Sequence, residues 1–163
     1  FQQDDFIERI NSILMQYNGS PHLLELELTE RTVMKDWDDI VNKLVKLKAM
    51  GFKISIDDFG TGYSSLSYLN RFPLNYLKID KSFIPQITNL QDKQAIVETI
   101  ILMAHRLHIK VVAEGVETIG QVKLLQQMGC DIIQGYYYSK PLAAKELMDF
   151  IELWEIYRQE RNI

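Results

Sequence analysis

The chain has 163 residues, of which 47% are hydrophobic, so it is long enough for one well-buried domain and too short for two. Its 18 basic and 22 acidic residues give a net charge of −4 without a run of like charge, which excludes a polybasic face for nucleic-acid polymers or membranes. The single Cys130 excludes a disulfide framework, and no apolar run approaches the ~20 residues of a membrane span. We therefore expect a cytoplasmic chain, and a membrane anchor would belong to another part of the parent protein.

Helical and strand-like patterns alternate along the whole chain. Helices are assigned where apolar residues recur every three or four positions, and strands where short runs are apolar or alternate. On the last helix, the spacing of Phe150, Trp154 and Tyr157 favours packing in the core. In chain order we expect helices over residues 4–16, 36–50, 64–69, 92–108, 118–128 and 143–158, and strands over residues 23–28, 53–56, 75–80, 110–113 and 130–133.

This alternation indicates parallel βαβ units with right-handed crossovers. An open α/β sheet usually places its ligand at one switch point, whereas at least four of these five predicted strands end in polar residues that point to a common target. We therefore expect an α/β fold of the TIM-like (β/α) barrel type, which normally has eight strands. Residues 1–163 would then be a single domain, the C-terminal portion of a barrel that lacks roughly three N-terminal strands.

Polar side chains gather where the predicted strands end. They are Glu27, Glu30, Asp57, Asp58, Lys78, Glu114, Glu117 and Gln134. Six carboxylates at one barrel mouth would repel one another strongly unless cations lie between them. Oxygen ligands without His or Cys favour hard ions, so we expect Mg²⁺ or Mn²⁺, and the adjacent Asp57 and Asp58 favour two ions over one. A two-metal site suits the cleavage of a phosphate ester by in-line attack of water.

Each of these residues also has a structural interpretation when it is taken alone. Glu27 suits the exposed side of a strand, Glu30 suits a helix cap, and Lys78 suits a solvated strand position. Asp57 and Asp58 could serve a turn, and consecutive strand residues point to opposite faces. The agreement of five strand ends is what favours a shared site.

Five segments, in order, resemble the C-terminal two-thirds of an EAL domain, the bacterial cyclic di-GMP phosphodiesterase. They are ELTE at 27–30, DDFGTGYSSLSYL at 57–69, LKIDKSF at 77–83, VVAEGVET at 111–118 and GCDIIQGYYYSKPL at 129–142. The resemblance covers nearly the whole chain. It implies a barrel with one atypical antiparallel strand, and it implies hydrolysis of cyclic di-GMP to linear pGpG.

The resemblance also assigns roles to the residues at the strand ends. Glu27 and Asp57 match ligands of one metal ion, and Asp58 and Glu114 match ligands of a second. Lys78 matches the residue that positions the hydrolytic water, and Glu114 has the further role of general base in this family.

The remaining matches concern the rim of the site and the loop that follows the two aspartates. Glu117 and Gln134 match further active-site positions, and Glu30 matches a glutamate that anchors the loop. The loop resembles the family's regulatory loop, which links dimerisation to metal binding, so a homodimer through this loop and its adjacent helices is implied. Sensory or diguanylate-cyclase domains are expected upstream. The loop begins with Phe59, Gly60, Thr61 and Gly62.

Two family ligands lie outside this sequence: the glutamate of the Glu-Ala-Leu tripeptide, and an asparagine expected on the strand just before residue 1. For that reason we expect the isolated 163-residue polypeptide to bind metal poorly and to hydrolyse little. Two other functions stay open at this point: a receptor that binds cyclic di-GMP without turnover, and an unrelated metal-dependent barrel enzyme with an acidic site. A receptor would be expected to lose several of these acids, and this chain keeps them.

Overall fold

A computed structural model describes residues 3, 5–30, 37–62 and 69–161 of the chain. All five predicted strands are present; of the helix predicted over residues 64–69, all but Leu69 lies outside the described residues. No helix in the described ranges is long and apolar enough to cross a membrane. The elements are α1 (Phe6–Gln16), η1 (Pro21–Leu23), β1 (Glu25–Thr29), α2 (Trp37–Ala49), β2 (Lys53–Phe59), β3 (Tyr76–Ile79), η3 (Lys81–Phe83), α4 (Gln91–Arg106), β4 (Lys110–Ala113), α5 (Ile119–Gln127), β5 (Ile132–Ile133) and α6 (Ala144–Arg161).

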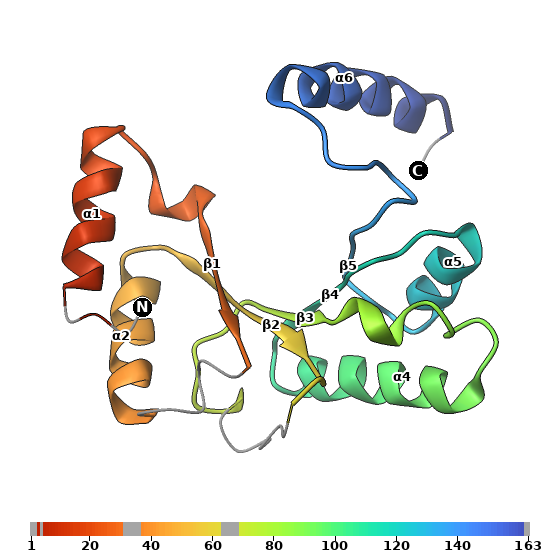
Figure 1. Ribbon diagram of the computed structural model, residues 1–163, viewed down its shortest axis with the longest axis horizontal. Helices are drawn as coiled ribbons and strands as arrows, with labels where there is room; N and C mark the ends of the chain where they lie inside the picture. Colours follow the sequence, from red (N-terminus) through yellow and green to blue (C-terminus); the bar gives the residue numbers. More distant parts are fainter. Residues whose placement is uncertain (1–2, 4, 31–36, 63–68, 162–163) are drawn as a thin grey trace.

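The strands form one sheet in the order β1-β2-β3-β4-β5, and each neighbouring pair is parallel (Figure 1). Because parallel neighbours need a crossover, the chain returns to the start of each strand through a helix or a longer connection. α2 contacts β2, and α4 contacts β3 and β4. The predicted parallel α/β fold is confirmed. The antiparallel strand that the family resemblance implies is not among these five.

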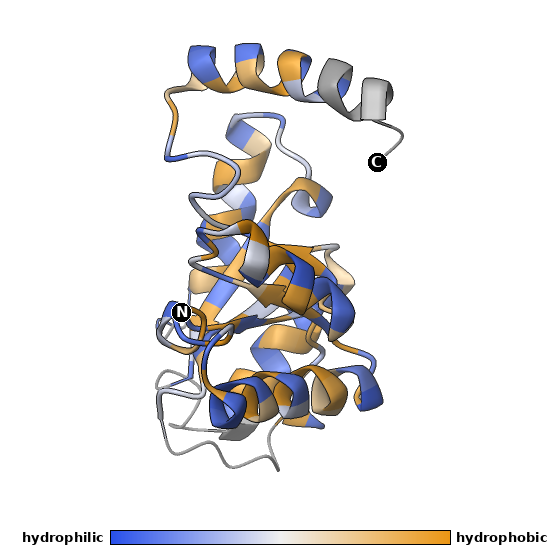
Figure 2. Ribbon diagram, turned by 90° about the vertical axis from the view of Figure 1, so that its right-hand side faces the viewer, coloured by the Kyte–Doolittle hydropathy of each residue, from blue (hydrophilic) through white to orange (hydrophobic). Residues whose placement is uncertain are grey.

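The two faces of the sheet differ, because side chains alternate along each strand. One face is apolar and shares a core with α2, α4 and α5; its buried strand residues are Leu28, Ile54, Ile56, Leu77, Ile79, Val111 and Ala113. Figure 2 shows hydrophobic residues concentrated where the sheet meets these helices. The other face carries the intervening residues, among them Glu27, Ser55 and Lys78. The alternation therefore places the polar candidates on the face away from the helices.

α6 lies apart from this core. In both views it follows an extended connection and stands clear of the sheet (Figures 1 and 2). Trp154 is 37% exposed, stacks on Phe150 at 6.1 Å between ring centroids and meets Tyr138 edge-on at 5.7 Å. The prediction that Trp154 packs in the core is wrong, because the helical spacing shows which residues share a helix face but not whether a sheet lies against that face. The side chain of Tyr157 lies outside the described residues.

Asp131 ties the end of α4 to the sheet, at the opposite end from the acidic strand ends. Its Oδ2 atom accepts hydrogen bonds from the backbone N–H of Val111 and from Nε2 of His105, both at 2.8 Å. Partial burial works against the charged carboxylate, but these two hydrogen bonds and the charge of His105 hold the pKa of Asp131 below its ordinary value. The ionised form is therefore favoured in the folded state.

Asp131→Asn is expected to lower the free energy of unfolding at pH 7 by about 1–2 kcal/mol, because charge-assisted hydrogen bonds are lost. A lowered pKa stabilises the fold above the ordinary carboxyl pKa, and that contribution disappears as the pH falls through the lowered value. The difference between the wild type and the variant should consequently shrink toward pH 3 in urea denaturation. Asp149→Asn, at an exposed position on α6, is the control. An equal difference at both pH values would contradict this role for the charge.

Candidate active site

Four of the predicted site residues lie on the polar face of the sheet, at the carboxyl ends of the four neighbouring strands β1 to β4. Glu27 lies on β1, Asp57 on β2 and Lys78 on β3, while Glu114 directly follows β4. Parallel strands end at one edge, so residues more than fifty positions apart in the chain meet there.

The end of β2 contains a bulge that brings both aspartates to this edge. Asp57 and Asp58 together stand opposite the single residue Lys78 in the β2–β3 ladder. Asp58 has a φ of +55°, and its N–H donates to Oδ1 of Asp57 at 2.9 Å. Ile56 and Phe59, on either side, are both buried. The extra residue therefore turns both aspartates away from the core, where strict alternation would have turned one of them inward.

Lys78 is the centre of the site. Its Nζ atom donates to Oε1 of Glu27 at 2.6 Å and lies 2.7 Å from Oε1 of Glu114. Oδ1 of Asp57 lies 3.8 Å from the same nitrogen. Three carboxylates from three separate strands thus meet at one ammonium group.

The surroundings of Lys78 favour its charged form. Its side chain is only 8% exposed, against 22–48% for the three carboxylates. Burial works against the ammonium charge, but the hydrogen bonds with Glu114 and Glu27 and the charge of Asp57 outweigh it and raise the pKa of Lys78 above its ordinary value. The interpretation of Lys78 as a solvated strand residue is wrong, because this side chain points toward acids and not toward water.

Glu30 and the loop after Asp58 form a second part of the site. The side chain of Glu30 is buried, and its Oε2 atom accepts a hydrogen bond from the N–H of Gly60 at 3.2 Å. A methyl group at Gly62 would lie 3.0 Å from Oε1 of the same carboxylate. The carboxylate therefore binds the loop at Gly60 and leaves little room for a side chain at Gly62. A cavity of about 320 Å³ beside it is lined by Thr29, Glu30, Asp58 and Thr61.

The short helix η3 contacts the two acid-bearing loops at a glycine in each. The ring of Phe83 occupies the space that a side chain on Gly60 would need, because a methyl group there would lie 2.9 Å from the ring, and Gly60 has a φ of +95°. A methyl group at Gly115, between Glu114 and Glu117, would lie 2.6 Å from Cβ of Lys81. Sequence reasoning did not find this role for η3; the signal was a glycine within two residues of an acid in both loops.

Among the described contacts, Glu117 and Gln134 do not reach Lys78. Both are exposed, and the N–H of Glu117 donates to Oε1 of Gln121 at 2.8 Å within the capping box of α5. The backbone of Gln134 pairs with Ala113 and Val116. The structure therefore does not bring the side chains of these two predicted site residues to Lys78.

The donor set is chemically suited to a hard cation, because it consists of carboxylate oxygens. The buried hydroxyl of Ser55, beside Glu27 in the register and two residues before Asp57, has no hydrogen-bond partner among the described residues. Yet these same described residues contain no three acidic, His or Cys side chains placed around a common point as metal ligands. The carboxylates are instead arranged around the ammonium of Lys78.

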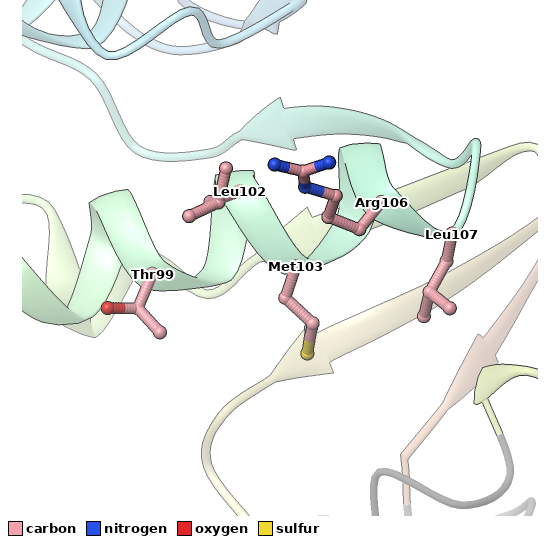
Figure 3. A pocket seen from close by; sticks show the side chains of 5 residues that line it. All are labelled: Thr99, Leu102, Met103, Arg106 and Leu107. Atoms are coloured by element: carbon pink, nitrogen blue, oxygen red, sulfur yellow. The ribbon is translucent and has the colours of Figure 1, made fainter.

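A separate hollow of about 420 Å³ lies on the surface of α4 (Figure 3). Its lining is Thr99, Leu102, Met103, Arg106 and Leu107. None of these residues is acidic, and all come from α4 and the residue after it. This hollow is therefore not part of the acidic site.

Together, the parallel α/β sheet and the polar residues at its strand ends are typical of the (β/α) barrel class of proteins, which place their sites at the carboxyl ends of the strands. The model of the EAL domain family matches residues 1–141, and the chain belongs to the EAL domain family. The resemblance drawn from the five sequence segments is thereby confirmed. α6 lies beyond the matched residues.

Relatives and solved structures agree with this family. The cyclic di-GMP phosphodiesterase NbdA of Pseudomonas aeruginosa is 44% identical over 148 residues, which cover 91% of this chain and 19% of NbdA. The structure of the PaMucR phosphodiesterase in complex with c-di-GMP has a TM-score of 0.85 at 42% identity, covering 90% of this chain and 59% of that chain. The manganese and cyclic di-GMP complex of Klebsiella pneumoniae BlrP1 has a TM-score of 0.78 at 36% identity, covering 86% of this chain and 36% of that chain.

The chain is short beside these proteins. It spans about a fifth of the length of the curated relatives that it matches. The five-stranded sheet nevertheless matches EAL structures over most of its length, which agrees with the predicted TIM-like barrel type.

Proposed function

We propose that this chain supplies catalytic residues of a phosphodiesterase that hydrolyses cyclic di-GMP to linear pGpG and so degrades a second messenger. The observation that carries the proposal is the meeting of Glu27, Asp57 and Glu114 at the buried ammonium of Lys78. The relatives NbdA and PaMucR are named as phosphodiesterases, and PaMucR was solved with c-di-GMP. The presence of all these acids argues against the receptor alternative.

We propose two Mg²⁺ or Mn²⁺ ions as cofactors. Glu27 and Asp57 would hold one, and Asp58 and Glu114 the other. The oxygen-only donor set and the manganese in the BlrP1 complex support this choice. Such ions, when bound, neutralise the carboxylates and polarise the phosphoryl oxygen of an ester.

The side chains then have separate tasks. Lys78, which keeps its proton at neutral pH, would donate hydrogen bonds and hold the attacking water in line with the phosphorus atom. Glu114 is partly exposed and would accept the proton of that water as general base. Water is thereby added across one phosphodiester bond, and linear pGpG is released. Glu117 and Gln134, exposed at the rim, would contact the substrate.

We further propose that the loop from Phe59 to Gly62 regulates the site and that the protein forms a homodimer through this loop and adjacent helices. The support is the hydrogen bond between Glu30 and Gly60, which links the loop to β1 next to Glu27. Upstream sensory or diguanylate-cyclase domains and a cytoplasmic location stay predictions. The name of the relative MucR, a bifunctional diguanylate cyclase and phosphodiesterase, agrees with the first of these.

The experiment is product analysis by liquid chromatography and mass spectrometry. The full-length protein as its gene encodes it, incubated with cyclic di-GMP and Mg²⁺ or Mn²⁺, should yield pGpG, and EDTA should stop the reaction. Tight binding of cyclic di-GMP without product would favour the receptor, and the absence of both binding and product would reject the proposal. The same assay on residues 1–163 alone tests the expectation that this polypeptide hydrolyses little.

A further inference from the structure

The carboxylates of the acidic site are arranged around a positive side chain of the protein itself. Glu27 and Glu114 each direct an oxygen at Nζ of Lys78, at 2.6 and 2.7 Å. Asp57, at 3.8 Å, is too distant for a hydrogen bond but close enough for charge attraction. Within the described part of the chain, no three such groups surround a common point as metal ligands.

An ammonium group and a divalent ion are attracted to the same carboxylates, and Glu27 and Glu114 each direct Oε1 at Lys78. A Mg²⁺ ion would lie about 2.0–2.1 Å from a carboxylate oxygen, and at Oε1 of Glu27 or Glu114 it would take lone pairs that now accept hydrogen bonds from Lys78. Both charges could not remain at this place without strong repulsion. Both backbones are fixed, Glu27 on β1 and Lys78 on β3, but the stem of Lys78 has four carbons with rotatable bonds, so its ammonium group has the greater reach.

We propose that Lys78 is the internal counter-ion of the acidic site, which holds Glu27, Asp57 and Glu114 together when no divalent ion is bound and competes with such an ion for their oxygens. This inference rests on the proposed metal dependence. Binding of the metal displaces the ammonium from Glu27 and Glu114. The displaced ammonium then becomes available to hold the attacking water, so Lys78 takes up its proposed catalytic role only after the metal has bound.

The test compares Mn²⁺ binding and melting temperature in full-length wild type, Lys78→Met and Lys78→Gln, each treated with EDTA and then freed of chelator. Met keeps most of the length of the lysine stem and removes its charge, and Gln adds a neutral hydrogen-bonding group. Lys53→Met is the matched control, because Lys53 is exposed at the other end of β2. Isothermal titration calorimetry gives the affinity, and thermal denaturation with EDTA or with Mn²⁺ gives the stability.

Both neutral variants are expected to bind Mn²⁺ about tenfold more tightly than the wild type, because the competing charge is gone. In EDTA they should melt at a lower temperature than the wild type, because the three carboxylates repel one another, and Mn²⁺ should raise their melting temperature more than it raises that of the wild type. A variant that folds only with Mn²⁺ would also support the inference. Lys53→Met should behave as the wild type.

The possible failures are distinct. If the wild type binds Mn²⁺ while both neutral variants bind it equally or more weakly, Lys78 is not a competitor and the inference is overturned, but the proposed metal dependence stands. If neither the wild type nor the variants bind Mn²⁺, the metal dependence and the inference fall together.

Discussion

Asp57→Asn in the full-length protein is expected to lower kcat for cyclic di-GMP hydrolysis by at least about 100-fold. Outer-shell partners of metal ligands already cost about 10- to 100-fold when they are changed, and Asp57 is a proposed ligand itself. The bulge gives it a fixed position: it lies on the same side as Lys78, accepts the N–H of Asp58 and is only 23% exposed. Asparagine keeps the shape and removes the charge that a cation needs.

The measurement is initial-rate kinetics at saturating Mg²⁺ or Mn²⁺, with kcat and KM determined separately. Asp92→Asn, at an exposed position in the first turn of α4, is the matched control and should leave kcat unchanged. A value of kcat for Asp57→Asn within threefold of the wild type would remove Asp57 from the catalytic set, whatever happens to KM.

Gly135→Ala is expected to destabilise the fold by more than about 3 kcal/mol, because the added methyl group meets backbone atoms. It would overlap the carbonyl oxygen and the nitrogen of Val116. Those two atoms are already hydrogen-bonded, the nitrogen to Gln134 at 3.1 Å and the oxygen to Tyr137 at 2.9 Å. If Val116 moved away from the added methyl group, these two hydrogen bonds, which join the loop after β4 to the residues after β5, would be lost.

Urea denaturation measures this loss. Gly120→Ala is the control, since Gly120 lies in the first turn of α5 and its methyl group would meet only Cγ2 of Thr88, at 3.5 Å, and the Oγ1 atom of Thr118, at 3.9 Å. A helical alanine should stabilise by about 0.5–1 kcal/mol, so the two substitutions should have opposite signs. Equal, small effects would show that the loop tolerates a side chain at residue 135.

The sequence predicted the strands and the grouping of the acids correctly where alternation of apolar and polar residues indicates which side chains are buried. The strand over residues 110–113 has the predicted bounds. Glu27, Asp57 and Glu114 converge because each points to the same face at the carboxyl end of its parallel strand. Period-two alternation fixes which face a strand residue takes, and parallel pairing brings strand ends together. The acids could therefore be grouped from the order of residues alone.

Other features depend on neighbours that a pattern does not reveal. The strand predicted over residues 53–56 continues to Phe59, because a bulge absorbs an extra residue; the step of three from Ile56 to Phe59, after the step of two from Ile54, was the available signal. The burial of Lys78 depends on three other strands. The position of α6 depends on tertiary contacts that its own spacing cannot report.

η3 lies against both acid-bearing loops of the site. Phe83 rests on Gly60 and Lys81 rests on Gly115, so one turn of chain acts as a spacer between the loop that follows the aspartates and the loop that carries Glu114. If either loop moved away from the other, it would lose its contact with η3. A substitution in η3 is therefore expected to disturb both loops at once, although η3 supplies none of the proposed metal ligands.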